Sequence, residues 1–342
     1  MRSLCVLAVG LVAACSGHDT SERVDAGAAD AALLGETCET CTQILLVTSA
    51  ALLDVQGDGT NLYVLSGHAP SRDLMTLSEI TPDGQQQSLA TSWLIQLFPT
   101  TSGDAVLYAV WSAASTGVEL HLHTGANDQL LGRFTSDAQL NVAGNATDVY
   151  AFVNDVGGTS TLWRMSRAGG APIGVATLNG TSRGFALGAT RAAIATSDDA
   201  AFVALPGPSA PSSVGQGAFG LSFTMMGDTP ISLTIDDLNN TTAHIVFASE
   251  PGHQVLYQFD KHDGGLAYVT SDARHAYWVE GTRACKGLTC MSDSQLWRSD
   301  LSLQDAAAIA TFPTSALGQD ATHLYGLEQR SEGHWLIDVL AK

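Results

Sequence analysis

The stretch Asp58-Gly-Thr-Asn-Leu-Tyr63-Val-Leu-Ser66 decides the fold, because the chain repeats its pattern of a polar turn followed by a short apolar strand. The repeats are centred on Tyr63, Tyr108, Tyr150, Ile194, Leu233, Tyr277 and Tyr325. Neighbouring centres lie 39 to 48 residues apart. A period in the forties with about four short strands per unit is typical of β-propeller blades. The sequence therefore predicts an all-β propeller.

One complete unit shows the four strands of a blade. They are predicted at Ala51–Gln56, Asn61–Ser66, Leu74–Ile80 and Gln86–Ala90. The second strand is apolar on both sides, as is typical of a strand packed between two layers. Because strands alternate in direction, one face of the ring carries the loops between second and third strands and the links between blades. We call this the loop face, and the opposite face, with the remaining turns, the turn face.

The two ends of the chain predict how the ring closes. The last unit has a second strand at His323–Leu327 and a third at Trp335–Leu340, but lacks a fourth. A spare strand, Gln43–Thr48, precedes the first unit. Pairing it with Trp335–Leu340 removes two exposed edges. We expect one domain over residues 42–342 with seven blades, or six if Asp198–Thr229 is an insertion.

The N-terminus indicates export. Residues 1–14 contain an apolar run that is too short to span a bilayer and is typical of a signal peptide. Its end, Leu11-Val-Ala-Ala-Cys15, resembles the lipobox of bacterial lipoproteins, which implies cleavage before Cys15 and lipidation of that residue. Residues 15–41 are polar and Ala-rich and predict a flexible tether. By the same resemblance, Ser16 favours the outer membrane. The alternative is an ordinary signal peptide beside a bystander cysteine.

Four further cysteines suit an oxidising compartment. They are Cys38, Cys41, Cys285 and Cys290. The Cys-x-x-Cys spacing also occurs in redox pairs and zinc sites, but an extended run follows here rather than a helix. In a closed ring, Cys38 and Cys41 lie on the opposite face from Cys285 and Cys290. The two pairs are too far apart for a disulfide between them. We therefore predict two local disulfides, Cys38 with Cys41 and Cys285 with Cys290.

The charge of the chain excludes one class of partner. Among 342 residues, 15 Lys and Arg stand against 34 Asp and Glu, which gives a formal net charge of -19. Phosphate backbones would repel such a chain, so nucleic-acid binding is disfavoured. We expect a monomer that meets the membrane through its lipid alone.

The segment Ala276-Tyr-Trp-Val-Glu280 resembles the YWTD-type and NHL/TolB-like propeller families. The lipobox, the tether and the tyrosine repeats together resemble propeller-like lipoproteins of Gram-negative bacteria. The resemblance implies a fold and a binding role, and carries no catalytic residue. The sequence also lacks a Gly-x-Ser-x-Gly elbow, a His-Glu-x-x-His helix, Walker glycines and an EF-hand loop.

Three groups of residues are candidates for a site. Carboxylates are predicted at one mouth of the ring, where they would attract calcium or a basic peptide: Asp155, Asp198, Asp199, Asp236, Asp237, Glu280 and Glu328. The alternative is solvated loop ends. The long loop Gly281–Ser294 carries Arg283 and Lys286 and is a candidate contact site. His121 and His123 share one side of a strand and form a possible metal pair. The alternative is an ordinary strand that faces solvent.

These patterns favour a non-enzymatic binding module in the cell envelope, with a protein or glycan as partner and no cofactor unless the acidic rim binds calcium. The alternative is a propeller-type lyase or hydrolase that acts on an envelope or extracellular polymer. It would need acid–base residues that converge in the funnel of the ring. A structural envelope protein without a small ligand is the third possibility.

Overall fold

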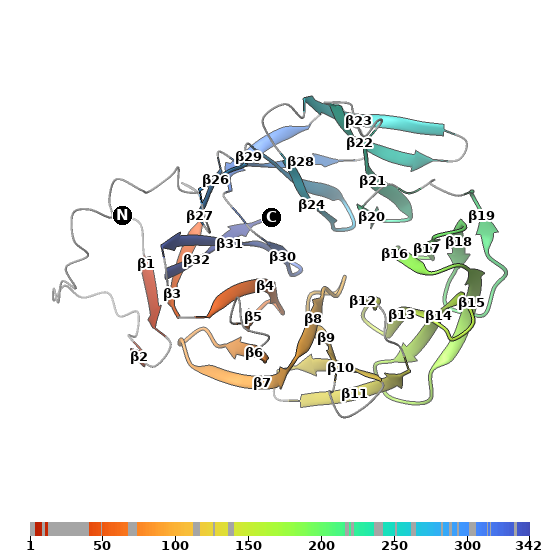
Figure 1. Cartoon of the computed structure of the whole chain (residues 1–342), viewed down its shortest axis with the longest axis horizontal. Helices are drawn as coiled ribbons and strands as arrows, with labels where there is room; N and C mark the ends of the chain where they lie inside the picture. The colour runs from red at the N-terminus through yellow and green to blue at the C-terminus, as the bar shows by residue number, and fades with distance from the viewer. Residues whose placement is uncertain are drawn as a thin grey trace.

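The computed structural model describes residues 4–8, 11–12, 41–48, 50–67, 74–111, 117–125, 127–135, 140–215, 219, 222–235, 242–249, 252–260, 265–281, 283–286, 289–292, 294–300, 306–312, 314, 316–331 and 334–342. All regular elements in these residues are β-strands. No helix in the described ranges is long and apolar enough to cross a membrane. The strands form sheets that stand around a central opening (Figure 1).

Six sheets consist of four strands each in chain order, and a separate two-stranded hairpin is inserted in the last of them. The first three, blades 1 to 3, are β4 (Ala51–Gly57), β5 (Leu62–Gly67), β6 (Met75–Ile80) and β7 (Gln86–Ser92); β8 (Leu94–Phe98), β9 (Val106–Trp111), β10 (Val118–Thr124) and β11 (Asn127–Phe134); β12 (Asn141–Gly144), β13 (Asp148–Asn154), β14 (Thr159–Ser166) and β15 (Ile173–Asn179). The next three, blades 4 to 6, are β16 (Ser182–Leu187), β17 (Arg191–Thr196), β18 (Ala200–Ala204) and β19 (Ser212–Ser213); β20 (Ser222–Met226), β21 (Thr229–Ile235), β22 (Thr242–Ser249) and β23 (Gly252–Asp260); β24 (Gly265–Ser271), β25 (His275–Gly281), β28 (Gln295–Asp300) and β29 (Ala307–Thr311).

The seventh blade joins the two ends of the chain. Its strands are β30 (Leu317–Gln319), β31 (His323–Ser331), β32 (His334–Ala341) and β3 (Thr42–Val47). β3 pairs antiparallel with β32, so the predicted closure is confirmed. Gln43 donates a hydrogen bond to the buried Asp338 at 2.9 Å across this pair. Two short strands, β1 (Leu4–Ala8) and β2 (Leu11–Val12), extend the same sheet beyond β3.

The all-β propeller fold predicted from the repeats is confirmed. Counting the sheets of the described residues gives six four-stranded blades and the seventh that β3 completes. The innermost strand β30 contacts β4, so blade 7 meets blade 1 and the ring is closed. All seven repeat centres fall on the second strand of a blade.

The core lies between neighbouring blades rather than within one. Tyr63 and Leu77 of blade 1 pack with Ile95 and Tyr108 of blade 2 in one buried cluster. Trp278 on the second strand of blade 6 is fully buried. This arrangement explains why second strands are apolar on both sides, since each is covered by two layers.

The repeated turn has a structural role. Asp58, Asp272 and Asp320 each accept hydrogen bonds from the backbone amides two and three residues later. Their second carboxylate oxygens accept the hydroxyl hydrogens of Tyr63, Tyr277 and Tyr325. The aspartate thus ties the turn to the buried strand that follows it. In blade 3, Asn145 makes the same two backbone contacts.

Candidate functional site

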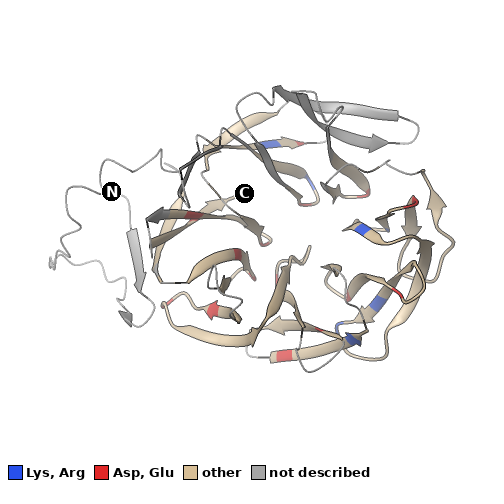
Figure 2. Ribbon diagram, viewed as in Figure 1, with Lys and Arg blue, Asp and Glu red and all other residues tan. Residues whose placement is uncertain are grey.

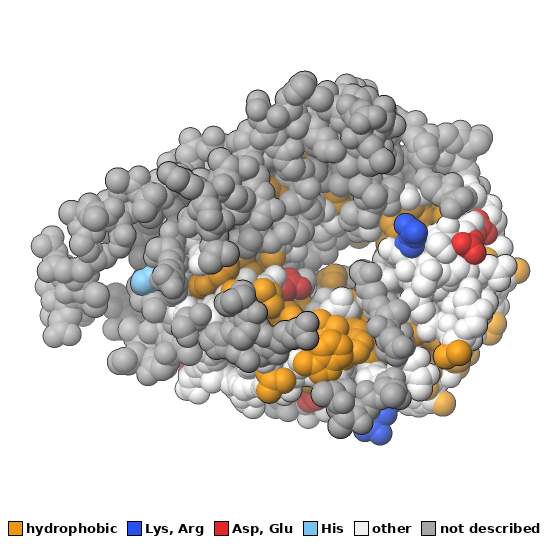
Figure 3. All heavy atoms as spheres, viewed as in Figure 1, with side chains coloured by type: hydrophobic (Ala, Val, Ile, Leu, Met, Phe, Trp, Pro, Cys, Tyr) orange, Lys and Arg blue, Asp and Glu red, His pale blue; other side chains and the backbone are white. Residues whose placement is uncertain are grey.

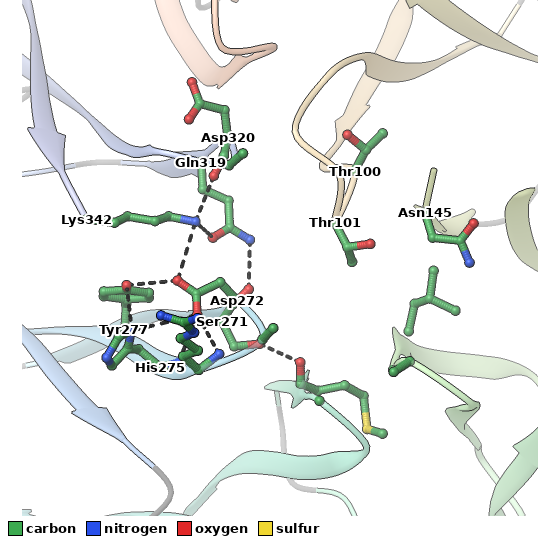
Figure 4. Close-up of a pocket in the computed structure, with 18 residues that line it drawn as sticks. Thr100, Thr101, Asn145, Ser271, Asp272, His275, Tyr277, Gln319, Asp320 and Lys342 are labelled. Atoms are coloured by element: carbon green, nitrogen blue, oxygen red, sulfur yellow. Dashed lines mark hydrogen bonds and ion pairs between the residues drawn. The ribbon is translucent and has the colours of Figure 1, made fainter. Parts of the chain in front are cut away.

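An axial cavity of about 540 Å³ opens where turns of blades 2 to 7 meet on the turn face. This volume lies within the range typical of small-molecule sites. Two polar walls face each other across the cavity, and residues of blades 4 and 5 complete the lining (Figure 4). They are Thr100, Thr101, Asn145, Leu187, Gly188, Ala189, Met225, Gly227, Ser271, Asp272, Ala273, Arg274, His275, Tyr277, Gln319, Asp320, Ala321 and Lys342.

The first wall is a polar network of blades 6 and 7 centred on Lys342. Its Nζ donates to Gln319 Oε1 at 3.0 Å and to the Asp320 carbonyl at 2.7 Å, and lies 3.9 Å from Asp272 Oδ2. Gln319 in turn donates from Nε2 to the carbonyl of Ser271 at 3.1 Å. These contacts hold the two blades together at the edge of the cavity (Figure 4).

Burial sets the charges of this wall. Burial lowers the pKa of Lys342, while the negative charges of Asp272 and Asp320 oppose that change. For Asp272, burial opposes ionisation, but the amides of Arg274 and His275 and the Tyr277 hydroxyl outweigh it and hold the pKa below its usual value. Burial also opposes ionisation of Asp320, but the Tyr325 hydroxyl and the turn amides outweigh it and hold the pKa of that carboxyl below its usual value. Both carboxylates are therefore ionised at neutral pH.

The second wall belongs to the turn between β8 and β9. Arg167, from the end of β14, holds this turn through a bidentate contact with Asp104, at 2.9 and 3.1 Å. It also donates to the Asn145 carbonyl at 3.1 Å. Burial opposes ionisation of Asp104, but Arg167 and Ser102 outweigh it and lower the pKa of that carboxyl. The Thr101 amide donates to the Gly144 carbonyl at 2.7 Å, so three segments build one rigid wall.

The carboxylates that line the cavity are engaged by contacts within the fold. The side chain of Asp320 is fully buried and is used by its own turn and by Tyr325. Asp272 serves two turn amides and Tyr277 and lies beside Lys342. The exposed Arg274 offers a guanidinium surface to a polar ligand, and Leu187 and Met225 offer apolar ones.

The predicted acidic rim is only partly described. Asp155 accepts a hydrogen bond from Thr161, Asp198 from Ser197 at 2.7 Å, and Asp199 from Ser213 at 2.7 Å. These three carboxylates thus serve their own loops or sheets. Asp236, Asp237 and the side chain of Glu280 lie outside the described residues, and Glu328 is half-buried in β31. Within the described ranges, no group of three His, Cys, Asp or Glu is placed to hold a metal ion. A calcium site stays a prediction.

The long loop of blade 6 contains a hairpin. β26 (Arg283–Lys286) pairs with β27 (Thr289–Ser292), and Cys285 lies directly opposite Cys290. Opposite residues of antiparallel strands have Cα atoms about 4.5–5.5 Å apart, which permits a disulfide. Cys41 is disulfide-bonded. Cys38, its predicted partner, and the predicted lipidation site Cys15 lie outside the described residues.

His121 and His123 share one side of β10, as their spacing predicts. The expectation of a solvent-facing strand is wrong for His123, which is 4% exposed because it lies at the interface between blades 1 and 2, against Tyr63 and Glu79. Its ring nitrogens lie 3.7 Å from Glu79 and 3.8 Å from Asp128. His121 Nδ1 lies 3.0 Å from Asp128 Oδ2. His123 thus links blades 1 and 2, whereas His121 contacts Asp128 and Glu119 of its own blade.

The sequence patterns did not reveal the cavity, because they indicated a binding surface on the loop face instead. The signal was present: Asp272, Tyr277 and Asp320 belong to the same repeated turn that revealed the blades. The repeat was interpreted only as a mark of the fold. No sequence pattern indicated Lys342, since this residue reaches the cavity only when the last strand closes the ring.

No family model and no curated protein matches the sequence. Solved structures do resemble the fold. The propeller domain of the Trilobed protease from Pyrococcus furiosus superposes with a TM-score of 0.58 at 9% identity, over 81% of this chain and 91% of that one. That domain has an open velcro topology, whereas β3 closes the ring here.

Two enzymes are also similar. The Pyrococcus horikoshii acylaminoacyl peptidase gives a TM-score of 0.55 at 9% identity, over 82% of this chain but only 49% of that one. An oligogalacturonate lyase in complex with manganese gives 0.52 at 11% identity, over 84% and 88%. Identities this low show the architecture alone. This chain is a β-propeller with the fold of these proteins.

Proposed function

We propose that this protein is a non-enzymatic binding module, and that its axial cavity takes a small polar ligand such as a sugar or the end of a peptide. The observation that carries the proposal is the cavity of about 540 Å³ at the ring axis, lined by turns of six blades. A site shared by so many blades is held rigid by the whole ring, which reduces the entropy cost of binding. The ligand would then bind on the turn face rather than on the loop face.

A lyase or hydrolase is the alternative function. A polymer-cleaving site would need a pair of free carboxylates or an equivalent acid and base. The two carboxylates that line the cavity, Asp272 and Asp320, are held by turn amides and tyrosine hydroxyls. The described residues of the cavity therefore favour binding over catalysis.

The proposal includes the place where the protein works. Leu11-Val-Ala-Ala-Cys15 supports export and lipidation at Cys15, and residues 15–41 would tether the propeller in the cell envelope. Cys15→Ser should then shift the protein from the membrane fraction to the soluble fraction and abolish incorporation of labelled fatty acid. Retention of both properties would contradict this part of the proposal.

A matched pair of variants tests the cavity. Ala273 and Ala146 are both exposed and both follow the first polar residue of the repeated turn, but only Ala273 lines the cavity. Ala273→Trp should block the site, and Ala146→Trp should leave it open. The measurement is thermal unfolding with a panel of mono- and disaccharides and of di- and tripeptides.

One ligand class should raise the unfolding midpoint of the wild type and of Ala146→Trp, but not of Ala273→Trp. A ligand at a hundredfold excess over its Kd stabilises the folded state by about 2.7 kcal/mol. A shift that persists in Ala273→Trp would place binding elsewhere. No shift with any compound of the panel would count against a small-ligand site.

A further inference from the structure

The outer strand of blade 7 differs from the outer strands of the other blades. β3 pairs with β32 through six consecutive residues, Thr42–Val47, without a break in register. In blades 1, 2, 3, 5 and 6 the fourth strand instead bulges, because one of its residues has no partner on the third strand. These residues are Leu89, Leu131, Val175, Leu256 and Ile309. The fourth strand of blade 4, β19, is only two residues long.

This difference concerns the backbone, because the outer edge of a sheet presents N–H and C=O groups that can pair with another strand. Proteins protect such edges with bulges, with very short strands or with charged side chains. The six other blades each have a bulged or a very short outer strand. β3 has neither, and its sequence, Thr42-Gln-Ile-Leu-Leu-Val47, contains no charged residue. Blade 7 therefore has the outer edge that is best suited to take a further strand.

The structure shows which kind of strand this edge accepts. β1 lies alongside β3 (Figure 1) and pairs with it in parallel over five residues, from Leu4 opposite Gln43 to Ala8 opposite Val47. The paired segment, Leu4-Cys-Val-Leu-Ala8, is apolar throughout. In the part of the chain that the structure describes, no other blade is extended beyond four strands. The edge of β3 thus takes an extended apolar segment in parallel.

The side chains of β3 explain why an apolar segment fits. Ile44 and Leu46 pack in the apolar cluster that blades 7 and 1 share. Leu45 lies between them in the strand, so it points to the opposite face of the sheet, and it is half-buried. A segment paired with β3 therefore has apolar neighbours on both faces, and apolar pairs across neighbouring strands stabilise a sheet.

The charge of the chain argues against a second copy as the occupant of this edge. The net charge is -19, and Lys and Arg occupy few positions on the described ring (Figure 2). Two such bodies repel each other, whereas an apolar segment of a different protein brings no charge of its own to the edge. A segment of another protein is therefore the favoured occupant.

We propose that, once residues 1–14 are removed, β3 docks an extended apolar segment of another protein as an additional, parallel strand of blade 7. The inference rests on the cleavage before Cys15 that is part of the proposed function, because cleavage takes β1 away from the edge. In such strand addition, backbone hydrogen bonds supply affinity and alternate side chains supply specificity. The site is separate from the axial cavity, since β3 is the outer strand of its blade whereas the cavity lies at the ring axis, where Figure 3 shows the central opening.

A labelled peptide with the sequence of residues 3–10, carrying Cys5→Ser, tests the edge. It is titrated into residues 16–342, which retain every strand of the seven blades, and into the full chain, and binding is read by fluorescence anisotropy. Residues 16–342 should bind at least about tenfold more tightly than the full chain, because β1 occupies the edge in the full chain. Equal binding by the two proteins, or no binding by either, would overturn the proposal.

Methylation of the peptide backbone tests whether the peptide binds as a strand. Two versions carry N-methyl groups, one at the even-numbered residues 4, 6 and 8 and the other at the odd-numbered residues 5, 7 and 9. Alternate N–H groups of a strand point to opposite edges, and only one edge faces β3. One version should therefore bind at least about tenfold more weakly than the unmethylated peptide, and the other should bind as well as it does. Equal effects of the two patterns would overturn the proposal.

Two variants of equal charge locate the site. Leu45→Lys places a lysine on β3, and Ile173→Lys places one on β15, the outer strand of blade 3, where Ile173 is 46% exposed. Leu45→Lys should weaken peptide binding by about tenfold or more, because charge on an edge strand opposes strand addition, and Ile173→Lys should leave it unchanged. If Leu45→Lys does not fold, the methylated peptides still decide the question on the unaltered residues 16–342.

Unchanged binding in a folded Leu45→Lys variant would overturn the proposal. A dimer of residues 16–342 that Leu45→Lys dissociates would also overturn it, since a second copy would then occupy the edge. Because residues 1–14 are already absent from the tested protein, these titrations do not depend on cleavage in the cell. A failure of cleavage would appear in the fractionation of Cys15→Ser instead.

Discussion

Tyr63 shows at the scale of one residue why the repeated turn needs tyrosine. Its hydroxyl donates to Asp58 Oδ2 at 2.6 Å and contacts Glu79 Oε1 at 3.1 Å, although its ring is fully buried. Burial and the neighbouring Asp58 carboxylate raise its pKa far above the usual value, so the hydroxyl keeps its proton as a donor. A phenylalanine would fill the same space but leave the two carboxylates with one donor fewer.

Tyr63→Phe should therefore lower the free energy of unfolding by about 1–3 kcal/mol, the cost of leaving buried polar groups without a partner. Tyr150→Phe is the matched control, since Tyr150 occupies the same repeat position and the described residues give its hydroxyl no hydrogen bond. It should change stability by less than about 0.5 kcal/mol. Urea unfolding of both variants measures the difference. Equal losses would show that the Asp–Tyr contact contributes nothing specific.

Asp54 predicts a dependence of stability on pH. Burial raises its pKa to about 7, although the Val55 amide donates to it at 2.8 Å. The folded state thus holds its proton more tightly than the unfolded state. Below pH 4 the Asp54 carboxyl is protonated in both the folded and the unfolded state and does not lower the free energy of unfolding. That free energy falls as the pH rises from about 4 through 7. Above pH 7 the folded state carries a poorly solvated charge.

Asp54→Asn removes that charge and should stabilise the protein at pH 8 by roughly 1–2 kcal/mol, a figure reduced because the side chain is partly exposed. At pH 4 the variant and the wild type should differ little. Urea unfolding at pH 4, 6 and 8 measures the trend. A difference that is the same at all three values would mean that Asp54 ionises as an ordinary surface carboxyl.

At the scale of elements, the turn between β8 and β9 connects distant parts of the ring. Gly103 has a positive φ of 63° and lies against the turn of blade 7, where a Cβ atom would overlap the backbone nitrogen of Ala321. Blades 2 and 7 are separated by blade 1, so this turn reaches past its neighbour at the ring axis. The close approach positions one wall of the cavity.

Gly103→Ala should destabilise the protein by more than about 2 kcal/mol, because backbone strain and backbone overlap act together. Gly125→Ala separates the two effects. Gly125 also has a positive φ, 53°, but no atom lies within 4 Å of the position of its Cβ. It should cost only about 1 kcal/mol. Similar costs for the two variants, measured by thermal unfolding, would show that the turn of blade 2 does not press on blade 7.

At the scale of the whole molecule, a closed ring gathers its negative charge into a compact body. The net charge of -19 makes the folded chain repel itself more than the expanded unfolded chain. Salt shortens the range of this repulsion, from about 30 Å at 0.01 M to about 10 Å at 0.1 M. Salt thus stabilises the fold by general screening of this repulsion, without ions bound at specific sites.

Raising NaCl from 10 to 300 mM at pH 7 should therefore increase the unfolding midpoint by about 2–4 °C, equivalent to roughly 1 kcal/mol. Scanning calorimetry measures it, and chloride is preferred because sulfate would also strengthen apolar burial. The same series at pH 4.5, where most carboxylates lose charge, is the control and should show little change. A midpoint that falls with salt at pH 7 would mean that ion pairs such as Arg167–Asp104 outweigh the repulsion.

Much of the fold could be predicted because the repeat is local. The four strands of blade 1 were placed within two residues at each end, since a polar turn and a strand buried on both sides leave a pattern in consecutive residues. Ring closure followed from an edge strand at each end that needed a partner. The site was harder, because Thr101, Asp272 and Lys342 are far apart in the chain and share no motif.

The sequence by itself determined the all-β ring, the position of each second strand and the pairing of β3 with β32. These features depend on periodicity and on unpaired edges, which the order of residues records directly. Only the tertiary structure decided which face holds the cavity and which residues line it. Both depend on how turns of separate segments meet around one axis, and no local pattern encodes those distances.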